Sequence, residues 1–423
     1  MLLRLLLAAS FVAVTVAAGG APAVAHAPAV AADTLLAQTI GGMELTLAIR
    51  RATEVPGPLR VDVIPHVPVR ALPIEVTVRS ATSTAVATGS ARLERDAART
   101  YPVALTVGES GPHWLELRAG DEFSQLPFQV LLPRASAAQL WTSGALAAAA
   151  LLLIGALAAA GLGPRRIALP LGGAGGMALV VAATLAVAPP ADPAGAAEPA
   201  GRPYVQARFT AVPAGADLLL RFTLLDSSTG RPVDDLVPHH QALAHAVVSS
   251  VDGASLHHLH PRRTAAGQLE MRLRGARPGP YRVDVEFERE DSGGQLVSGR
   301  FEVAGAARTE AETPATLPTT PGRVVAGRPV QIEIDTGPGR VQPWLGMAGH
   351  LIVRTERGDF LGHAHEQASM AAGGAVPDDT VAAFEPRLRF AFTFPEPGRY
   401  FVWLQYARDL RIVTVPYVVE VAP

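Results

Sequence analysis

Three long apolar runs are set between segments in which apolar and polar residues alternate. The first run, residues 1–32, is rich in Leu, Ala and Val and ends in small residues, which is typical of a secretory signal peptide. Ala23-Val24-Ala25 and Val30-Ala31-Ala32 both fit signal-peptidase cleavage, and the residues leave the choice open. Cleavage after Ala25 would make His26 the N-terminal residue, whose amine and imidazole nitrogens could bind a metal. The alternative is that His26 is a chance residue in an unstructured tail.

The other two apolar runs predict a transmembrane helical hairpin over residues 137–188. Each run is free of charge and supplies the roughly 20 residues that cross a bilayer. Only Gly163-Pro164-Arg165-Arg166 lies between them, and the arginine pair favours the cytoplasmic side for this turn. We therefore expect a cell-membrane protein whose soluble regions both lie on the extracytoplasmic side, periplasmic or extracellular.

Short alternating segments separated by Pro and Gly predict β-strands in the rest of the chain. Residues 33–134 fit an Ig-like antiparallel β-sandwich, in which we expect His66 and His113 to be structural or surface residues. Two further β domains follow at 204–306 and 323–423, after Pro- and Ala-rich linkers at 189–203 and 307–322. The predicted fold class is mainly β, with Ig-like β-sandwich domains plus a two-helix transmembrane hairpin.

The last two domains are copies of one another, here called the first copy (204–306) and the second copy (323–423). The segment from Pro238 aligns without a gap with the segment from Pro343, and PGPYRVDVEF later matches PGRYFVWLQY. Six of the sixteen positions from His245 to His260 are identical in the second copy, and three of these six are histidines. The conserved spacing suggests a shared function for these histidines.

The repeated spacing predicts a hairpin that gathers three imidazoles on one face. With the turn centred on Asp252-Gly253, His245 lies opposite His260; with the turn centred on Arg357-Gly358, His350 lies opposite His365. Opposed residues have Cβ atoms about 5 Å apart, and a residue two positions along the strand shares their face. The candidate metal ligands fall into two groups of three, called here the first triad (His245, His258, His260) and the second triad (His350, His363, His365).

The amino-acid composition leaves histidine as the candidate metal ligand. The chain has no cysteine, which excludes disulfides, thiolate metal sites and cysteine nucleophiles. Its formal net charge of −2 gives no indication of nucleic-acid binding. Neutral imidazole suits copper, zinc, nickel and iron, so the histidines predict a metal ion without identifying which one. The same histidines could instead pack and hydrogen-bond without a metal.

Several nearby residues have two interpretations. His239, His240 and His257 occur only in the first copy and fit either an auxiliary metal-loading patch or solvated side chains. Met347 and Met370 fit either soft thioether ligands for copper(I) or core filler.

The segments DLVPHH, AHAVVSSVDGASLHHLHP and PGPYRVDVEF, with their counterparts in the second copy, resemble exported bacterial β-domain proteins associated with copper handling. The N-terminal domain followed by a membrane helix is similar in outline to YtkA-like and FixH-like sandwiches, and more loosely to CopC-like proteins. This resemblance implies an extracytoplasmic role linked to copper. The N-terminal metal motif of CopC-like proteins is not evident beyond His26.

Three functions remain open from the sequence. The first is copper binding, delivery or resistance, with a copper transporter or chaperone as the expected partner and no catalytic residue. The second is a zinc-type metalloenzyme with an open coordination position, in which Glu366 or Asp235 could handle protons. The third is a metal-free structural or adhesion protein built from sandwich domains.

Overall fold

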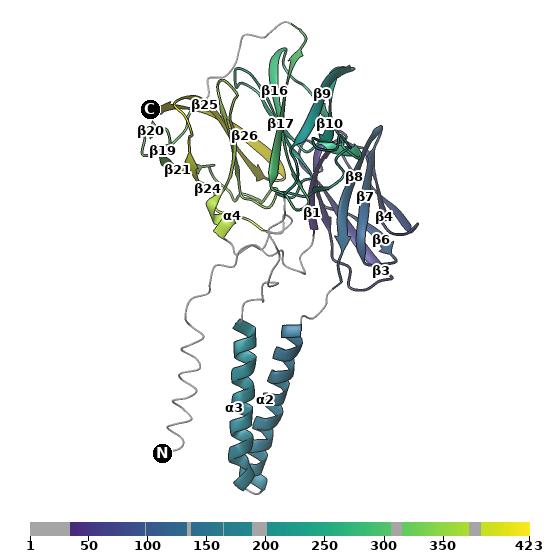
Figure 1. Ribbon diagram of the computed structural model, residues 1–423, viewed down its shortest axis with the longest axis vertical. Coiled ribbons are helices and arrows are strands. Elements are labelled where there is room, and N and C mark those ends of the chain that lie inside the picture. Colours follow the sequence, from purple (N-terminus) through teal and green to yellow (C-terminus); the bar gives the residue numbers. More distant parts are fainter. Residues whose placement is uncertain are drawn as a thin grey trace. The chain divides into compact units, whose positions relative to one another are not determined.

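The computed structural model describes residues 34–97, 99–132, 137–163, 165–187, 201–305, 315–371 and 382–423. The chain divides into two compact units, one with the two apolar helices and one with the strands. The predicted signal peptide with His26 and most of the 189–203 linker lie outside the described residues, as does the side chain of Met370. The mainly β fold with a helical pair confirms the predicted fold class (Figure 1).

The N-terminal domain is a sandwich of two four-stranded antiparallel sheets, with strand orders β1-β2-β3-β6 and β5-β4-β7-β8. Apolar side chains from both sheets fill one core, and β6 shows the alternation of buried and exposed positions that this requires. The strands are β1 (Thr34–Ile40), β2 (Met43–Ile49), β3 (Gly57–Pro65), β4 (Pro73–Ser80), β5 (Val86–Arg92), β6 (Tyr101–Val107), β7 (Gly111–Ala119) and β8 (Glu122–Val130).

The first copy also forms two antiparallel sheets. One has the order β14-β15-β10-β9, and the other has the order β11-β16-β12-β13 with β17 added on β16. The strands are β9 (Val205–Ala214), β10 (Asp217–Asp226), β11 (Leu236–Val237), β12 (His245–Ser250), β13 (Leu256–Leu259), β14 (Arg262–Ala265), β15 (Gln268–Leu273), β16 (Gly279–Arg289) and β17 (Gly294–Val303).

The second copy repeats this plan with a six-stranded sheet around β26-β25-β22-β23 and a three-stranded sheet β19-β21-β24. Part of the 307–322 segment, expected to be a linker, forms β18 and β19, which pair with β26 and β21. The elements are β18 (Ala315–Thr316), β19 (Thr319–Thr320), β20 (Val324–Val325), β21 (Pro329–Asp335), β22 (His350–Thr355), β23 (Leu361–His365), α4 (Gln367–Ala371), β24 (Arg387–Thr393), β25 (Gly398–Arg408) and β26 (Arg411–Ala422).

The two copies contact one another through equivalent residues. Val247 and its counterpart Ile352 lie in one buried apolar cluster with Phe401 and Trp403. Phe401 packs on the turn glycine of the first copy, where a Cβ on Gly253 would collide with its ring. The counterpart of Phe401 in the repeat is Arg282, which donates to the carbonyl of Gly358 in the other turn at 3.1 Å. These reciprocal contacts are those of an isologous two-fold interface.

The N-terminal domain packs against the first copy through interactions of two buried arginine side chains. Arg262 of β14, which is 3% exposed, lies 3.4 Å from the carboxylate of Glu122 on β8. The neighbouring Arg263 lies over the ring of Trp114, with its guanidinium carbon 4.6 Å from the ring centre. Because buried charges need partners, these pairs fix the orientation of the two domains.

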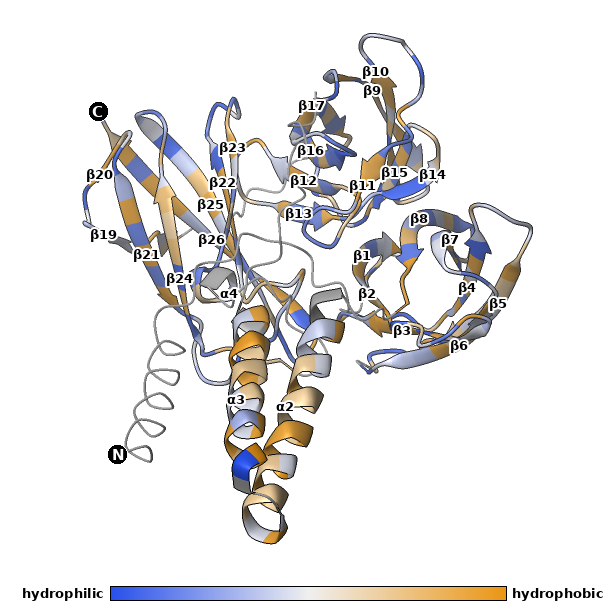
Figure 2. Ribbon diagram, turned by 60° about the horizontal axis from the view of Figure 1, so that its bottom comes forward, coloured by the Kyte–Doolittle hydropathy of each residue, from blue (hydrophilic) through white to orange (hydrophobic). Residues whose placement is uncertain are grey.

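The helical unit is an antiparallel pair, α2 (Ala137–Leu162) and α3 (Arg165–Val187), joined by a short turn. A Cβ on Gly175 of α3 would lie 2.9 Å from the side chain of Leu153 on α2, so a small residue is needed for this close packing. Both helices are predominantly hydrophobic along their length (Figure 2). Leu140–Leu162 and Arg166–Leu185 are long and apolar enough to cross a membrane.

His66 is a buried titratable group at the edge of the N-terminal domain. Its Nε2 lies 3.0 Å from the hydroxyl of Thr46, and its ring meets the edge of Trp344 in the second copy. Burial lowers the pKa of His66 to about 4. Of the two expectations for His66, the structural role applies, because His66 is 3% exposed and lies between domains.

Acidification should therefore destabilise the protein through His66. The unfolded chain binds the proton near pH 6.5 and the folded chain only near pH 4, so stability present above pH 6.5 is lost as the pH falls towards 4. The loss attributable to His66 reaches about 3 kcal/mol at pH 4. His66→Gln should flatten this dependence in thermal unfolding of the metal-free chain between pH 7 and pH 4.5. An equally steep dependence in the variant would contradict this assignment.

Candidate metal centre

The two predicted hairpins have the expected register. In the second copy His350 on β22 pairs with His365 on β23, and Ile352 pairs with His363. In the first copy Ala246 pairs with Leu259 and Val247 with His258, which continues to a pairing of His245 with His260. The first histidine of each triad begins a central strand, and the other two lie on or next to an edge strand.

Each hairpin closes through a four-residue loop rather than the expected two-residue turn. The last backbone pairs are Ser250 with Ser255 and Thr355 with Phe360, and Gly253 and Gly358 have φ of 75° and 70°. A side chain at either glycine would be strained in this left-handed conformation. The wider loop adds one residue to each side, so the register and the shared face of the histidines are unchanged.

The three rings of each triad converge. One ring nitrogen from each histidine lies within 4.8 Å of the others, in both triads. The ring centres are 5.0 to 5.5 Å apart in the first triad and 4.9 to 5.2 Å apart in the second. Imidazoles that share one ion with metal–nitrogen bonds of about 2.0 Å would have ring centres about 5 Å apart. Both triads therefore have the dimensions of three-imidazole metal sites.

The first histidine of each triad is oriented by a backbone carbonyl. Nε2 of His245 donates to the carbonyl of His239 at 2.9 Å, and Nε2 of His350 donates to the carbonyl of Trp344 at 3.0 Å. Residues 239 and 344 are equivalent in the repeat. Since a carbonyl only accepts, Nδ1 carries the lone pair in both rings and points at the triad, as outer partners of metal-binding histidines require.

The middle histidine of each triad is oriented by the other copy. Nδ1 of His258 donates to Oε1 of Gln405 on β25 at 2.8 Å, and Nδ1 of His363 lies 3.7 Å from a carboxylate oxygen of Glu286 on β16. Glu286 and Gln405 are equivalent positions of the repeat, so the copies exchange these partners. The remaining Nε2 atoms of the middle histidines then face the Nδ1 atoms of the first histidines, at 3.3 Å in the first triad and 3.0 Å in the second.

The third histidine of the first triad is held by the N-terminal domain. Nδ1 of His260 donates to the carboxylate of Glu44 at 2.5 Å, and the backbone N–H of His260 donates to the hydroxyl of Thr39 at 2.8 Å. Nε2 of His260 is buried without a hydrogen-bond partner in the described part of the chain, as is Nε2 of His365. The lone pair of His260 Nε2 is thus left for a cation, and Nε2 of His365 offers a second when the proton of that ring is on Nδ1.

Four of the six triad imidazoles, those of His245, His258, His350 and His365, are neutral near pH 7. Burial, followed by the neighbouring histidines, lowers the pKa of His245, His258 and His350 well below the ordinary value. Burial also lowers the pKa of His365 to about 3. Neutral rings keep the lone pairs that metal ions need.

The histidines of the two triads differ in their exposure to solvent. His245, His258 and His260 are at most 8% exposed, whereas His363 and His365 are partly exposed. The rings of the two triads come as close as 5.8 Å, between His258 and His363. The six histidines therefore form one cluster with a closed and a more open half.

The candidate proton-handling residues have other partners. Glu366 accepts hydrogen bonds from the backbone and hydroxyl of Ser369, and Asp235 is paired with Arg289. Met347 forms a backbone pair with Trp344 and has a half-buried side chain. Glu44 and Gln405, which orient ligands, were missed by sequence reasoning. Gln405 lies in the aligned PGRYFVWLQY segment, whereas no pattern marks Glu44.

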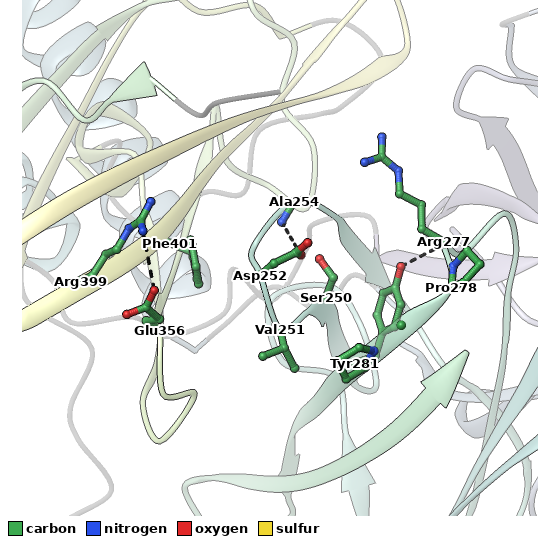
Figure 3. Close-up of a pocket in the computed structure, with 12 residues that line it drawn as sticks. Ser250, Val251, Asp252, Ala254, Arg277, Pro278, Tyr281, Glu356, Arg399 and Phe401 are labelled. Atoms are coloured by element: carbon green, nitrogen blue, oxygen red, sulfur yellow. Dashed lines mark hydrogen bonds and ion pairs between the residues drawn. The ribbon is translucent and has the colours of Figure 1, made fainter. Parts of the chain in front are cut away.

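A separate pocket lies at the opposite end of the hairpins. It is lined by the loop of the first hairpin around Asp252, by Tyr281, and by Phe401 of the second copy (Figure 3). Arg399 in its wall pairs with Glu356 at 3.7 Å. No histidine lines this pocket, so it is separate from the triads.

The comparisons with known proteins identify the repeat and little else. Residues 204–304 and 314–423 each match a family model described as a domain of unknown function, DUF8832. No curated protein matches the chain. The predicted resemblance to YtkA-like, FixH-like and CopC-like families is not tested by these findings and stays a prediction.

Among solved structures, the chain matches several multidomain proteins at very low similarity. A tetra-tandem repeat from a large adhesion protein has 8% identity and a TM-score of 0.17, covering 91% of this chain and 82% of that one. The chicken CNTN1 FN1-FN3 domains have 7% identity and a TM-score of 0.17, covering 89% and 97%. A putative membrane anchored protein from Corynebacterium diphtheriae has 10% identity and a TM-score of 0.16, covering 90% and 92%. A likeness at this level carries no information about function. The family information for this chain is therefore the match of its two copies to the DUF8832 model.

Proposed function

We propose that this protein is a membrane-anchored, extracytoplasmic metal-binding protein that holds copper at its two histidine triads. The observation that carries the proposal is the convergence of three ring nitrogens per triad, each set within 4.8 Å. Outer partners support it, because each holds one ring nitrogen of a buried histidine and leaves the other nitrogen directed at the triad. Packing alone leaves the buried Nε2 atoms of His260 and His365 without a hydrogen-bond partner in the described part of the chain.

Charge favours monovalent copper when both triads are filled. The rings of the two triads come within 5.8 Å of one another, so two bound ions would be near neighbours. At an illustrative separation of about 8 Å, two divalent ions repel by about 8 kcal/mol at an effective dielectric of about 20, and two monovalent ions by about 2 kcal/mol. One carboxylate serves each triad, Glu44 the first and Glu286 the second, which balances two single charges.

The helical pair supplies the anchor. Two spans joined by a short turn return the chain to the side from which it came, so the β domains before and after the pair share one side of the membrane. Arg165 and Arg166 at the turn favour the cytoplasm for the turn and the opposite side for the β domains. A copper transporter or chaperone is the partner that we propose for this site.

Metal content tests the proposal directly. The full chain in detergent, loaded anaerobically with copper(I), should bind two ions by elemental analysis because there are two triads. His245→Ala and His350→Ala should each bind one, and the double variant none above background. His257→Ala is the matched control, since His257 lies beside His258 but contacts Ser255, and it should bind two. Two ions retained in the double variant would sink the proposal.

The carboxylate of Glu44, which pairs with His260, should raise the metal affinity of the first triad. Glu44→Gln leaves the side-chain shape but removes the charge that orients His260. Loss of an outer partner of this kind lowers metal affinity by about 10- to 100-fold. We expect that loss at the first triad alone, measured by competition with a copper(I) chelator in the His350→Ala background. Equal affinity with and without Glu44→Gln in that background would show that the carboxylate has no such role.

The absence of cysteine allows a clean test of topology. Single cysteines replace Thr84 in the N-terminal domain, Gly163 at the helical turn or Gly293 in the first copy, all exposed positions. A maleimide that cannot cross membranes should label the first and third in intact bacterial spheroplasts, and the cysteine at 163 only after permeabilisation. Labelling of the cysteine at 163 in intact spheroplasts would reverse the proposed orientation.

A further inference from the structure

Three histidines of the first copy have no counterpart in the second: His239, His240 and His257. Two of them have partners away from the triads. Nδ1 of His239 pairs with the carboxylate of Glu288 at 2.6 Å, and Nε2 of His257 lies 3.3 Å from the hydroxyl of Ser255. His240 is different, because its nearest ring neighbours beyond His239 are histidines of the cluster.

The ring of His240 lies against the second triad, although it belongs to the first copy. Its centre is 4.2 Å from that of His365 in an edge-to-face contact, and 6.3 Å from that of His363 and from that of His245 in the first triad, so the contact with His365 is what assigns it to the second triad. Nδ1 of His240 is buried and has no hydrogen-bond partner in the described part of the chain, as is true of Nε2 of His365. Two orphaned nitrogens on touching rings are costly unless a cation joins them.

The loop that carries His240 is firmly built. Backbone hydrogen bonds run in both directions between His239 and Ala242. His240 and Gln241 inside this turn have left-handed φ of 45° and 65°, which non-glycine residues seldom adopt. The turn therefore fixes where the His240 side chain emerges.

The first triad lacks an equivalent of this ring. The residue that corresponds to His240 is Leu345, in the same left-handed turn at φ 54°, and it packs in an apolar cluster with Trp344 and Ala37. Trp344 lies against both triads, with its ring centre 5.4 Å from that of His258 and 6.0 Å from that of His260 in the first triad, and 5.3 Å from that of His350 in the second. The indole thus borders both triads, whereas the His240 imidazole makes its close contact with His365 of the second triad.

We propose that His240 is the fourth ligand of the second triad, which makes the second site a four-histidine copper site shared between the two copies. The inference rests on the proposed function of the triads. Relative to the spacing of about 5 Å for rings on one ion, the His240 ring is about 1 Å too near His365 and about 1 Å too far from His363. A side-chain rotation that carried the ring away from His365 and towards His363 would bring both distances to that spacing.

The test isolates the second site by working in the His245→Ala full chain in detergent. His240→Leu is the natural replacement, because the second copy carries leucine in the same turn. We expect copper(I) affinity, measured by chelator competition, to fall at least about tenfold when this ligand is lost. X-ray absorption should report four nitrogen neighbours per copper with His240 and three with leucine. Unchanged affinity and neighbour number would overturn the inference.

The matched control places His240→Leu in the His350→Ala chain, which retains the first site alone. Affinity there should not change, because His240 belongs to the other site; an equal loss in both backgrounds would mean a structural effect and would overturn the assignment. Thermal unfolding of the metal-free chains checks that each variant folds. If the His245→Ala chain itself binds no copper, the proposed function of the second triad fails, and the role of His240 fails with it.

Discussion

The pairing of two strands across a four-residue loop is the constraint on which the site depends. It places His350 opposite His365 and, in the other copy, aligns the strands so that His245 meets His260. A shift of one residue would turn the edge-strand histidines to the opposite face. The turn glycines, Gly253 and Gly358, hold that register because each occupies a left-handed conformation with a side chain of the other copy packed against it.

The site is finished by residues far away in sequence. Glu44 belongs to the N-terminal domain, and Gln405 and Glu286 each serve the triad of the opposite copy. A fragment that begins at the first copy would keep all six triad histidines and lose the carboxylate behind His260. This arrangement gives the N-terminal domain a defined task, since it both seals the first triad and sets the orientation of its third ring.

The sequence allowed the hairpins, the triads and most strands to be predicted because these depend on local spacing. The strands β1 and β5 are hard to predict from apolar and polar alternation, because β1 is buried on nearly every residue and β5 consists mostly of small residues. The hydrogen bond between Glu44 and His260 joins residues 216 positions apart. Periodicity cannot reveal such a contact, because it arises only when two domains dock.

The reciprocal contact between the copies has an evolutionary consequence. A symmetric homodimer of one such domain would satisfy the same interface, with every outer partner appearing twice. When the two domains are joined in one chain, equivalent positions no longer have to carry the same residue, so each copy can change without the other. The pairs Glu286 with Gln405, His239 with Trp344, and His240 with Leu345 are differences of this kind, at equivalent positions around one cluster. Tandem fusion thereby allowed a pair of equal sites to become two sites with separate properties.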